Sequence, residues 1–132
     1  MPRKLQAMTP ETTPFWTGGA NGELLIHKCV ACGLYIHPPQ PICRVCRGET
    51  VPTAVSGRGR VVTYTINYQP WTPELSQPYA IAIVELVEQA DLRFVSNIVG
   101  CPPTDTVIGM PVRVVFERHE DTWLPLFQPD AP

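Results

Sequence analysis

The chain has 132 residues, which is enough for one domain of ordinary size or for two small ones. Its 10 Lys and Arg against 12 Asp and Glu give a formal charge of −2. This charge argues against the broad electrostatic binding by which many proteins hold nucleic acids or anionic membranes. No apolar run approaches the length that a membrane-spanning helix needs.

The N-terminal segment is expected to be loose over residues 1–9 and to form one short helical turn after them. Thr13 is the expected N-cap and Pro14 the first helical residue, because proline suits that position. Phe15 and Trp16 follow directly, and large apolar side chains on so short an element need a surface to pack against. That surface is either the rest of this chain or another subunit. The second interpretation makes Phe15 and Trp16 part of a partner interface.

Four cysteines form two Cys-x-x-Cys pairs with ten residues between them, Cys29 with Cys32 and Cys43 with Cys46. Each pair places two thiolates on one side of a tight knuckle, and two facing knuckles supply a tetrahedron of sulfurs. We therefore predict a rubredoxin-like zinc ribbon over residues 27–53 that binds one structural Zn²⁺. Because four thiolates leave no open coordination position, this metal is expected to organise the fold rather than to catalyse a reaction.

The same cysteines allow other interpretations. Iron also accepts four thiolates, which would make the chain an electron carrier. Disulfides would suit a secreted protein, but the basic residues Arg3 and Lys4 are not followed by the apolar stretch of a secretory signal. We therefore expect reduced thiols and a cytoplasmic protein. The fifth cysteine, Cys101, is expected to be a small buried apolar residue.

After residue 54 the sequence changes to short runs of β-branched and aromatic residues. Every second residue from Val62 to Tyr68 is apolar, which places these side chains on one face of a strand. Five antiparallel strands in so short a region suit a closed barrel of the OB-fold type, because closure removes exposed edges. The expected fold is mainly β, with an N-terminal segment at 1–26, the ribbon at 27–53 and the OB-fold at 54–132. The expected strands are 61–68, 79–87, 92–99, 111–117 and 122–127.

Three further residues are candidates for ligand or partner binding. Arg58 and Arg60 flank Gly59, and a glycine between two arginines lets a backbone approach a phosphate closely. The alternative is a solvated start of a strand. Trp71, in the proline-rich loop 69–78, is either a partner anchor or a packed lid. The sequence has no nucleophile elbow, phosphate loop or dinucleotide fingerprint, so no residue is predicted to be catalytic.

The order of several short motifs resembles a family of zinc-ribbon and OB-fold proteins associated with acyl-CoA, named domain of unknown function thirty-five. The resemblance spans nearly the whole chain, and it departs from the family at Glu88-Gln89-Ala90, where members often have Glu-Gly. The matching motifs are Phe15-Trp16, Gly22-Glu23-Leu24-Leu25, Cys29-Val30-Ala31-Cys32-Gly33, Pro38-Pro39, Cys43-Arg44-Val45-Cys46, Ser56-Gly57-Arg58-Gly59, Ala82-Ile83-Val84-Glu85-Leu86, Ile108-Gly109-Met110-Pro111-Val112, Val114-Val115-Phe116-Glu117 and Leu124-Pro125-Leu126-Phe127.

The resemblance implies an accessory subunit of a heteromer. Its expected partner is a thiolase-like enzyme of the lipid-transfer-protein type, an aldolase that cleaves a C–C bond in a β-hydroxyacyl-CoA derived from a steroid side chain. The family also implies contact with the acyl-CoA, for which Arg58 and Arg60 are the candidates. Other members imply a thiolase and HMG-CoA synthase assembly or a hot-dog-fold enoyl-CoA hydratase as the partner. An adaptor for single-stranded nucleic acid is the alternative from a different class.

Overall fold

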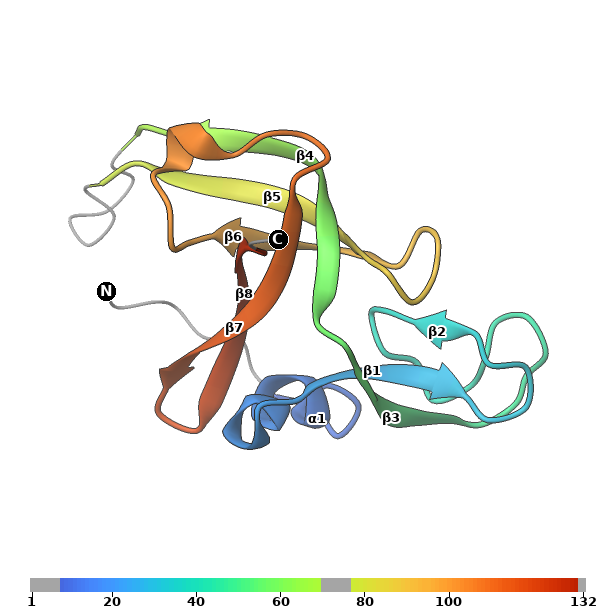
Figure 1. The fold of residues 1–132 in the computed structure, drawn as a ribbon. Coiled ribbons are helices and arrows are strands. Elements are labelled where there is room, and N and C mark those ends of the chain that lie inside the picture. The colour runs from blue at the N-terminus through green and yellow to red at the C-terminus, as the bar shows by residue number, and fades with distance from the viewer. Residues whose placement is uncertain (1–7, 70–76, 131–132) are drawn as a thin grey trace.

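The computed structural model describes residues 8–69 and 77–130. Figure 1 shows a short N-terminal helix, a small sheet and a closed barrel of five strands. This arrangement confirms the predicted mainly β fold class. The predicted partner anchor Trp71 lies outside the described residues. Among the residues that are described, no helix has the length and apolar character to cross a bilayer.

The helix α1 (Thr13–Thr17) starts one residue earlier than its sequence suggests. Thr12 is its N-cap, so the expectation that Thr13 is the N-cap is wrong by one residue. The Thr13 hydroxyl instead donates to the carbonyl oxygen of Thr9 at 2.7 Å, which ties the helix to the preceding turn. A 3₁₀ turn (Gly18–Asn21) follows and leads the chain into the first strand.

The small sheet has the order β2-β1-β3. Strand β1 (Leu24–Cys29) pairs with β2 (Tyr35–Ile36) on one side and, over its whole length, with β3 (Thr50–Val55) on the other. Strand β3 was not predicted from the sequence; it contains Pro52, and three of its six residues are exposed. Proline is tolerated there because β3 has a neighbour on one side only within this sheet, so one edge needs no N–H donor.

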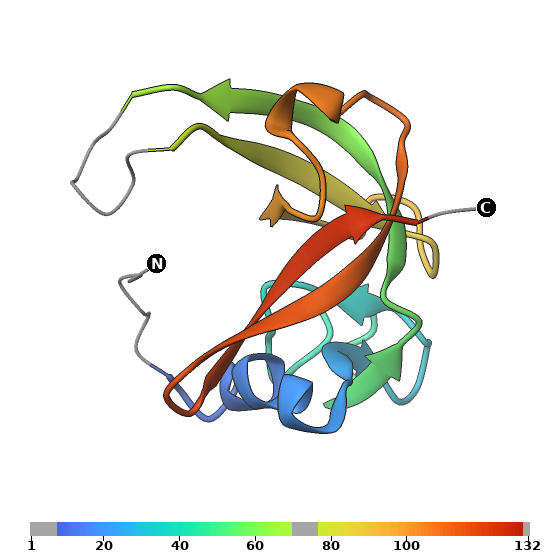
Figure 2. The ribbon, with the colours of Figure 1, turned by 60° about the vertical axis from the view of Figure 1, so that its left-hand side comes forward.

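The barrel has the strand order β4-β5-β6-β8-β7, and β7 returns to β4 to close it. Figure 2 shows β4 curving over the barrel as it continues from β3. All neighbours are antiparallel except β6 and β8, which pair in parallel through Ile98 and Phe127. The expectation of an entirely antiparallel barrel is therefore wrong at this one pair. The strands are β4 (Arg58–Asn67), β5 (Tyr79–Leu86), β6 (Arg93–Ile98), β7 (Pro111–His119) and β8 (Thr122–Pro129).

A β-bulge in β4 changes which side chains face the barrel interior. The register against β5 shifts between Val61 and Thr63. Val61, before the shift, is fully buried, whereas Tyr64 and Ile66, after it, are partly buried while Thr63 and Thr65 are exposed. The predicted alternation from Val62 onward therefore describes the strand after the bulge. Before it, the opposite set of residues points inward, as expected where one extra residue is inserted.

One hydrophobic core joins the helix, the small sheet and the barrel. Phe15 of α1 and Leu24 and Ile26 of β1 belong to the same buried cluster as Val84 of β5 and Phe127 of β8. The rings of Phe15 and Phe94 meet edge to face, with their centroids 6.0 Å apart. The two halves of the chain therefore bury apolar surface against each other.

The turn between β5 and β6 also ties the barrel to the small sheet. The side-chain amide of Gln89 accepts from the backbone N–H of Tyr35 at 2.9 Å and donates to its carbonyl at 3.0 Å. Next to it, Glu88 accepts from the backbone N–H of Ser56 at 2.7 Å. The amide of Gln89 thus occupies the free edge of β2, where a further strand would pair. This is the turn in which the sequence departs from the common family pattern.

Candidate metal centre

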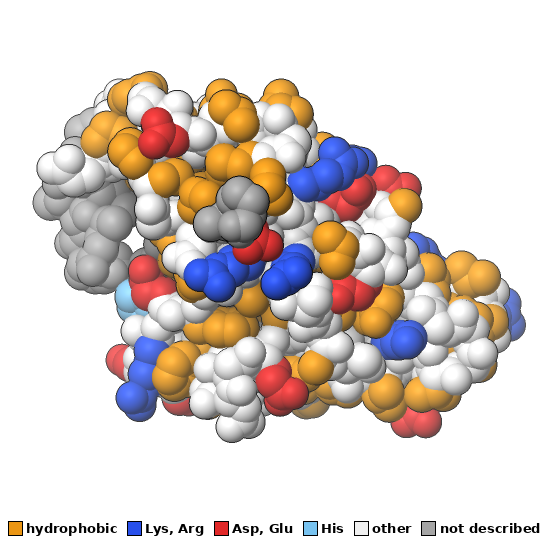
Figure 3. All heavy atoms as spheres, in the orientation of Figure 1, with side chains coloured by type: hydrophobic (Ala, Val, Ile, Leu, Met, Phe, Trp, Pro, Cys, Tyr) orange, Lys and Arg blue, Asp and Glu red, His pale blue; other side chains and the backbone are white. Residues whose placement is uncertain are grey.

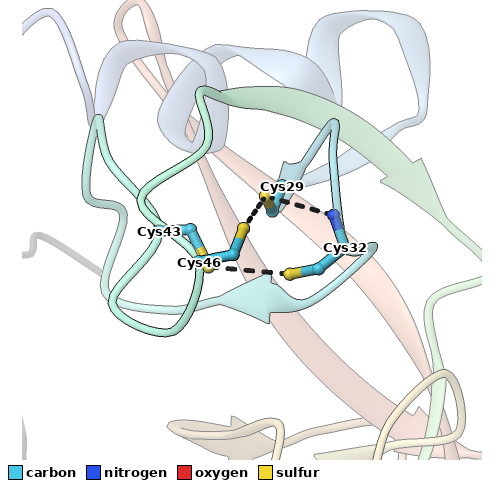
Figure 4. Close-up of side chains that lie close together, drawn as sticks. All are labelled: Cys29, Cys32, Cys43 and Cys46. Carbon is cyan, nitrogen blue, oxygen red and sulfur yellow. Dashed lines mark hydrogen bonds between the residues drawn. The ribbon is translucent and has the colours of Figure 1, made fainter.

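Three neighbouring segments bring the four predicted ligands together. Cys29 ends β1 and Cys32 lies in the turn after it, while Cys43 and Cys46 lie in the loop between β2 and β3. Figure 4 shows the four side chains pointing toward one another. Cys29 and Cys43 are buried, whereas Cys32 and Cys46 are on the exposed side of the cluster.

The spacing of the sulfurs fits a tetrahedral metal. All four Sγ atoms lie within 4.8 Å of one another, with Cys29 and Cys46 at 3.4 Å and Cys32 and Cys43 at 3.7 Å. A tetrahedron of thiolates around zinc, with bonds of roughly 2.3 Å, separates the sulfurs by about 3.8 Å. These distances are far longer than the roughly 2.05 Å of a disulfide, and the four thiols are free.

The two knuckles have the same backbone construction. In the first, the N–H of Gly33 donates to the carbonyl of Cys29 at 3.0 Å, and in the second the N–H of Arg47 donates to that of Cys43 at 2.9 Å. Both donors have a positive φ, +78° at Gly33 and +65° at Arg47. Glycine adopts this left-handed conformation readily, whereas arginine rarely does.

Gly48 lets the knuckles approach each other closely. A Cβ at this position would lie 2.9 Å from the sulfur of Cys29 and 3.3 Å from that of Cys46. It would also lie 3.0 Å from the Cβ of Ala31 on the facing knuckle. Any larger residue would displace a ligand or separate the two turns, so Gly48 belongs to the metal centre although it offers no ligand atom.

The thiols have strongly different affinities for protons. The backbone N–H of Cys32, directed at the sulfur of Cys29, lowers the pKa of Cys29 to about 6, and burial opposes this shift. The backbone N–H of Gly48 lowers the pKa of Cys46, but the neighbouring thiols of Cys29 and Cys32 outweigh it and raise that pKa to about 12. Four adjacent thiolates repel one another, so a cation is needed for all of them to ionise together.

The two predicted phosphate ligands have different surroundings. Arg60 forms a 3.0 Å ion pair with Glu85, which also binds Arg93 at 3.0 Å. Arg93 and Arg60 both lower the pKa of Glu85. Arg58 is more exposed, and its nearest acidic partner among the described residues is Asp130 at 3.7 Å. Arg58 is therefore freer than Arg60 to bind an anion.

Arg113 is a basic residue near Arg58 that sequence reasoning missed. It lies directly opposite Arg58 on β7, and its guanidinium can donate to the side-chain oxygen of Gln128 at 3.0 Å when the Gln128 amide is turned so that this oxygen faces Arg113. Only the pairing of β4 with β7 brings the two arginines together, so spacing along the chain offered no signal. On the face drawn in Figure 3, basic and acidic side chains are interspersed rather than gathered into one basic area.

Phe15 and Trp16, two of the predicted interface residues, lie within α1. Phe15 is buried at 8% exposure within this chain, whereas Trp16 is partly buried and packs against the same core. Phe15 therefore offers little surface of its own to another subunit.

Cys101 is partly buried against the core, and burial raises the pKa of its thiol. It is not part of the four-cysteine cluster.

Two family models match successive parts of this chain. Residues 16–52 match "ChsH2, rubredoxin-like zinc ribbon domain" and residues 52–117 match "ChsH2, C-terminal OB-fold domain". The chain belongs to the ChsH2 family, also named DUF35. The predicted family is therefore confirmed. A solved structure described as "Ltp2-ChsH2(DUF35) aldolase" superimposes with a TM-score of 0.81 at 34% identity, and the match covers 95% of this chain and 98% of that chain.

Two curated relatives are longer proteins. A "probable enoyl-CoA hydratase alpha subunit" of Thermomonospora curvata is 38% identical over 123 residues, which are 89% of this chain and 37% of that protein. A "3-oxo-4,17-pregnadiene-20-carboxyl-CoA hydratase alpha subunit" of Mycobacterium tuberculosis is 35% identical over 123 residues, 91% of this chain and 38% of that protein. The chain thus spans well under half the length of either relative.

Proposed function

We propose that this chain is an accessory subunit that binds and supports a thiolase-like enzyme of the Ltp2 type. The proposed enzyme is an aldolase that cleaves a C–C bond in a β-hydroxyacyl-CoA derived from a steroid side chain. The observation that carries the proposal is the match to the Ltp2-ChsH2 aldolase structure, which covers nearly the full length of both chains at 34% identity. The carbon–carbon chemistry is assigned to the partner subunit.

The four-cysteine site supports a structural role for this chain and a catalytic role for its partner. Four cysteines occupy every position of a tetrahedral ion, so the site has no place for a substrate or an activated water. We propose that the ion is Zn²⁺, one per chain, and that it fixes the two knuckles against β1 and β3. A colourless protein with one zinc per chain is expected from elemental analysis. A red protein with thiolate-to-iron absorption would instead identify an electron carrier.

Contact with the CoA part of the substrate is proposed for Arg58. Its guanidinium is exposed and weakly paired, whereas Arg60 is already held by Glu85. Charge-assisted contacts to phosphate contribute roughly 1.5–3 kcal/mol when partly desolvated. Arg58→Gln should therefore weaken binding of CoA to the complex at least several-fold, and Arg60→Gln should weaken it less. Equal affinities for wild type and Arg58→Gln would contradict this role.

A hydratase partner is the second candidate. Two relatives are named as alpha subunits of hydratases that act on CoA thioesters, one of them as a probable enoyl-CoA hydratase, and this chain matches 37% and 38% of their lengths. The same accessory role with a hydratase would need the same ribbon and barrel. A nucleic-acid adaptor has less support, because the net charge is −2 and basic side chains do not gather on the face seen in Figure 3.

Co-expression separates the candidates. The tagged chain is produced with a thiolase-like protein from the same genome and, separately, with a hydratase-like protein from that genome. A stable complex with the thiolase-like protein, and aldolase activity that requires this chain, are the expected results. A complex with the hydratase-like protein alone would replace the first candidate by the second. Full solubility and activity of the thiolase-like protein without this chain would contradict the accessory role.

A further inference from the structure

A small pocket lies where α1, the segment after β2 and strand β6 meet. Its volume is about 270 Å³. Phe15 and Trp16 come from α1, His37 and Pro38 from the segment after β2, and Phe94 and Val95 from β6. The pocket therefore depends on the packing of the N-terminal helix and the ribbon against the barrel.

Three packed rings give the pocket a firm base. The centroids of Phe15 and His37 are 4.8 Å apart, and those of His37 and Phe94 are 5.4 Å apart. Phe15 is 8% exposed, so its position is fixed by the core. Burial lowers the pKa of His37 to about 4, with a smaller contribution from His27, so the imidazole is neutral at neutral pH.

The chemistry of the walls selects an uncharged, apolar occupant. Among residues 8–69 and 77–130, no side chain that lines the pocket carries a charge at neutral pH. Within these ranges the phosphates of CoA would find no cation at the pocket, and the exposed Arg58 is not one of its lining residues. Small-molecule sites usually have volumes of roughly 300–1,000 Å³, so a pocket of about 270 Å³ suits one large side chain better than a steroid acyl group.

Apolar surface continues beyond the mouth of the pocket. Val95 lines the pocket and is nevertheless 65% exposed, and Trp16 is only partly buried. A fixed apolar pocket with further apolar contacts around it is the arrangement in which a single anchor residue dominates the energy of a protein interface. Contiguous apolar surface of this kind typically marks a site that a partner covers.

We propose that this pocket receives one large apolar side chain, aromatic or leucine-like, from the surface of the partner enzyme. The inference rests on the proposed function, since the partner is the thiolase-like subunit. It also changes the role of Phe15 and Trp16. These two residues form the socket into which the partner inserts an anchor, rather than being anchors themselves.

The test places a bulky side chain at the mouth of the pocket. Val95→Trp adds apolar area but blocks the socket, so its complex with the thiolase-like protein should dissociate at least tenfold more readily. The matched control is Val87→Trp, because Val87 is 67% exposed and lies outside the pocket. Val87→Trp should bind as the wild type does. Thermal unfolding of both variants alone checks that each is folded.

The outcomes separate this inference from the proposed function. Wild-type affinity of Val95→Trp for the thiolase-like protein overturns the socket and leaves the accessory role standing. Equal weakening by Val95→Trp and Val87→Trp also overturns it, because the effect is then not specific to the pocket. Loss of octanoyl-CoA binding by the isolated Val95→Trp chain, with partner binding intact, shows that the pocket holds an acyl group instead. A wild-type chain that fails to bind the thiolase-like protein overturns both proposals.

Discussion

The four-cysteine end of the ribbon (the metal end below) and the barrel are stabilised by different interactions. The barrel contributes most of a cluster of twelve buried apolar residues, whereas the cluster at the metal end consists of Cys29, Ile36 and Cys43. So small an apolar cluster cannot offset the conformational entropy of the chain that it orders. Strand β1 belongs to both, with Leu24 and Ile26 in the large cluster and Cys29 in the small one. The comparison predicts that the metal end needs a bound ion for its stability, whereas the barrel is stabilised by apolar burial.

Removal of the metal should have the largest effect, and the resulting loss of structure should be confined to the metal end. Apparent binding free energies of structural zinc sites are roughly 10–16 kcal/mol at neutral pH, and this stabilisation is lost on chelation or in Cys43→Ser. Amide hydrogen exchange should then rise strongly in the two knuckles and in β2. Amides of β5 and β6 should keep most of their protection. Unfolding of the barrel at the same chelator concentration would contradict the conclusion that the two regions are stabilised separately.

A cavity in the barrel should destabilise the barrel and leave the metal end intact. Phe127 is fully buried and packs against Phe94, with ring centroids 5.5 Å apart. Phe127→Ala should lower the free energy of unfolding by about 3–5 kcal/mol. Below its melting temperature the variant should still bind one equivalent of zinc, as measured by competition with a chromophoric chelator. A loss of zinc affinity as large as the loss of stability would show that the two ends are one unit.

Loss of the Gln89 side chain should have a smaller effect, and this effect should appear where the barrel contacts the small sheet. Gln89→Ala removes two hydrogen bonds to the backbone of Tyr35, at 2.9 and 3.0 Å, each worth about 1 kcal/mol. Faster exchange at Tyr35 and faster zinc release are expected, with little change in the barrel. Gln89→Glu is the matched comparison: it keeps the acceptor for the Tyr35 N–H but places a carboxylate oxygen against the Tyr35 carbonyl, so it should be at least as destabilising as Gln89→Ala.

His37 has the smallest effect at neutral pH, and its effect on stability grows as the pH falls. Its pKa is lowered to about 4 by burial, whereas in the unfolded chain it has an ordinary value of about 6.5. The unfolded state therefore binds a proton first as pH falls, so this residue's contribution to stability declines between about pH 6.5 and about pH 4 and is constant below that. His37→Gln should show a shallower decline over this range in denaturant titrations. Parallel curves for the two proteins would exclude the effect.

The cluster of four cysteines was accessible from sequence because the chemistry of such a site is local. Two Cys-x-x-Cys pairs define their own geometry, and the structure places all four sulfurs within 4.8 Å of one another. The positions of the barrel strands were also predictable, since β-branched runs and proline-rich turns alternate along the chain. Five strands were expected after residue 54, and five strands form the barrel.

The features that the sequence did not reveal depend on contacts between distant segments. The inward face of β4 changes at a bulge after Val61, and a bulge has no distinct sequence signal here. Strand β3 was not expected, because Thr50–Val55 is held by pairing with β1 and not by apolar alternation. The opposition of Arg58 and Arg113 arises only from the closure of β7 onto β4.

The tight contact at Gly48 has an evolutionary consequence. A methyl group at this position would meet the sulfur of Cys29 at 2.9 Å and the Cβ of Ala31 at 3.0 Å, so glycine is required while the two knuckles stay this close, as a shared ion would keep them. In a descendant that had lost its cysteines, the turn could relax and residue 48 would be free to change. Glycine at 48 and cysteine at 29 should therefore be gained and lost together, which makes position 48 a marker of metal dependence.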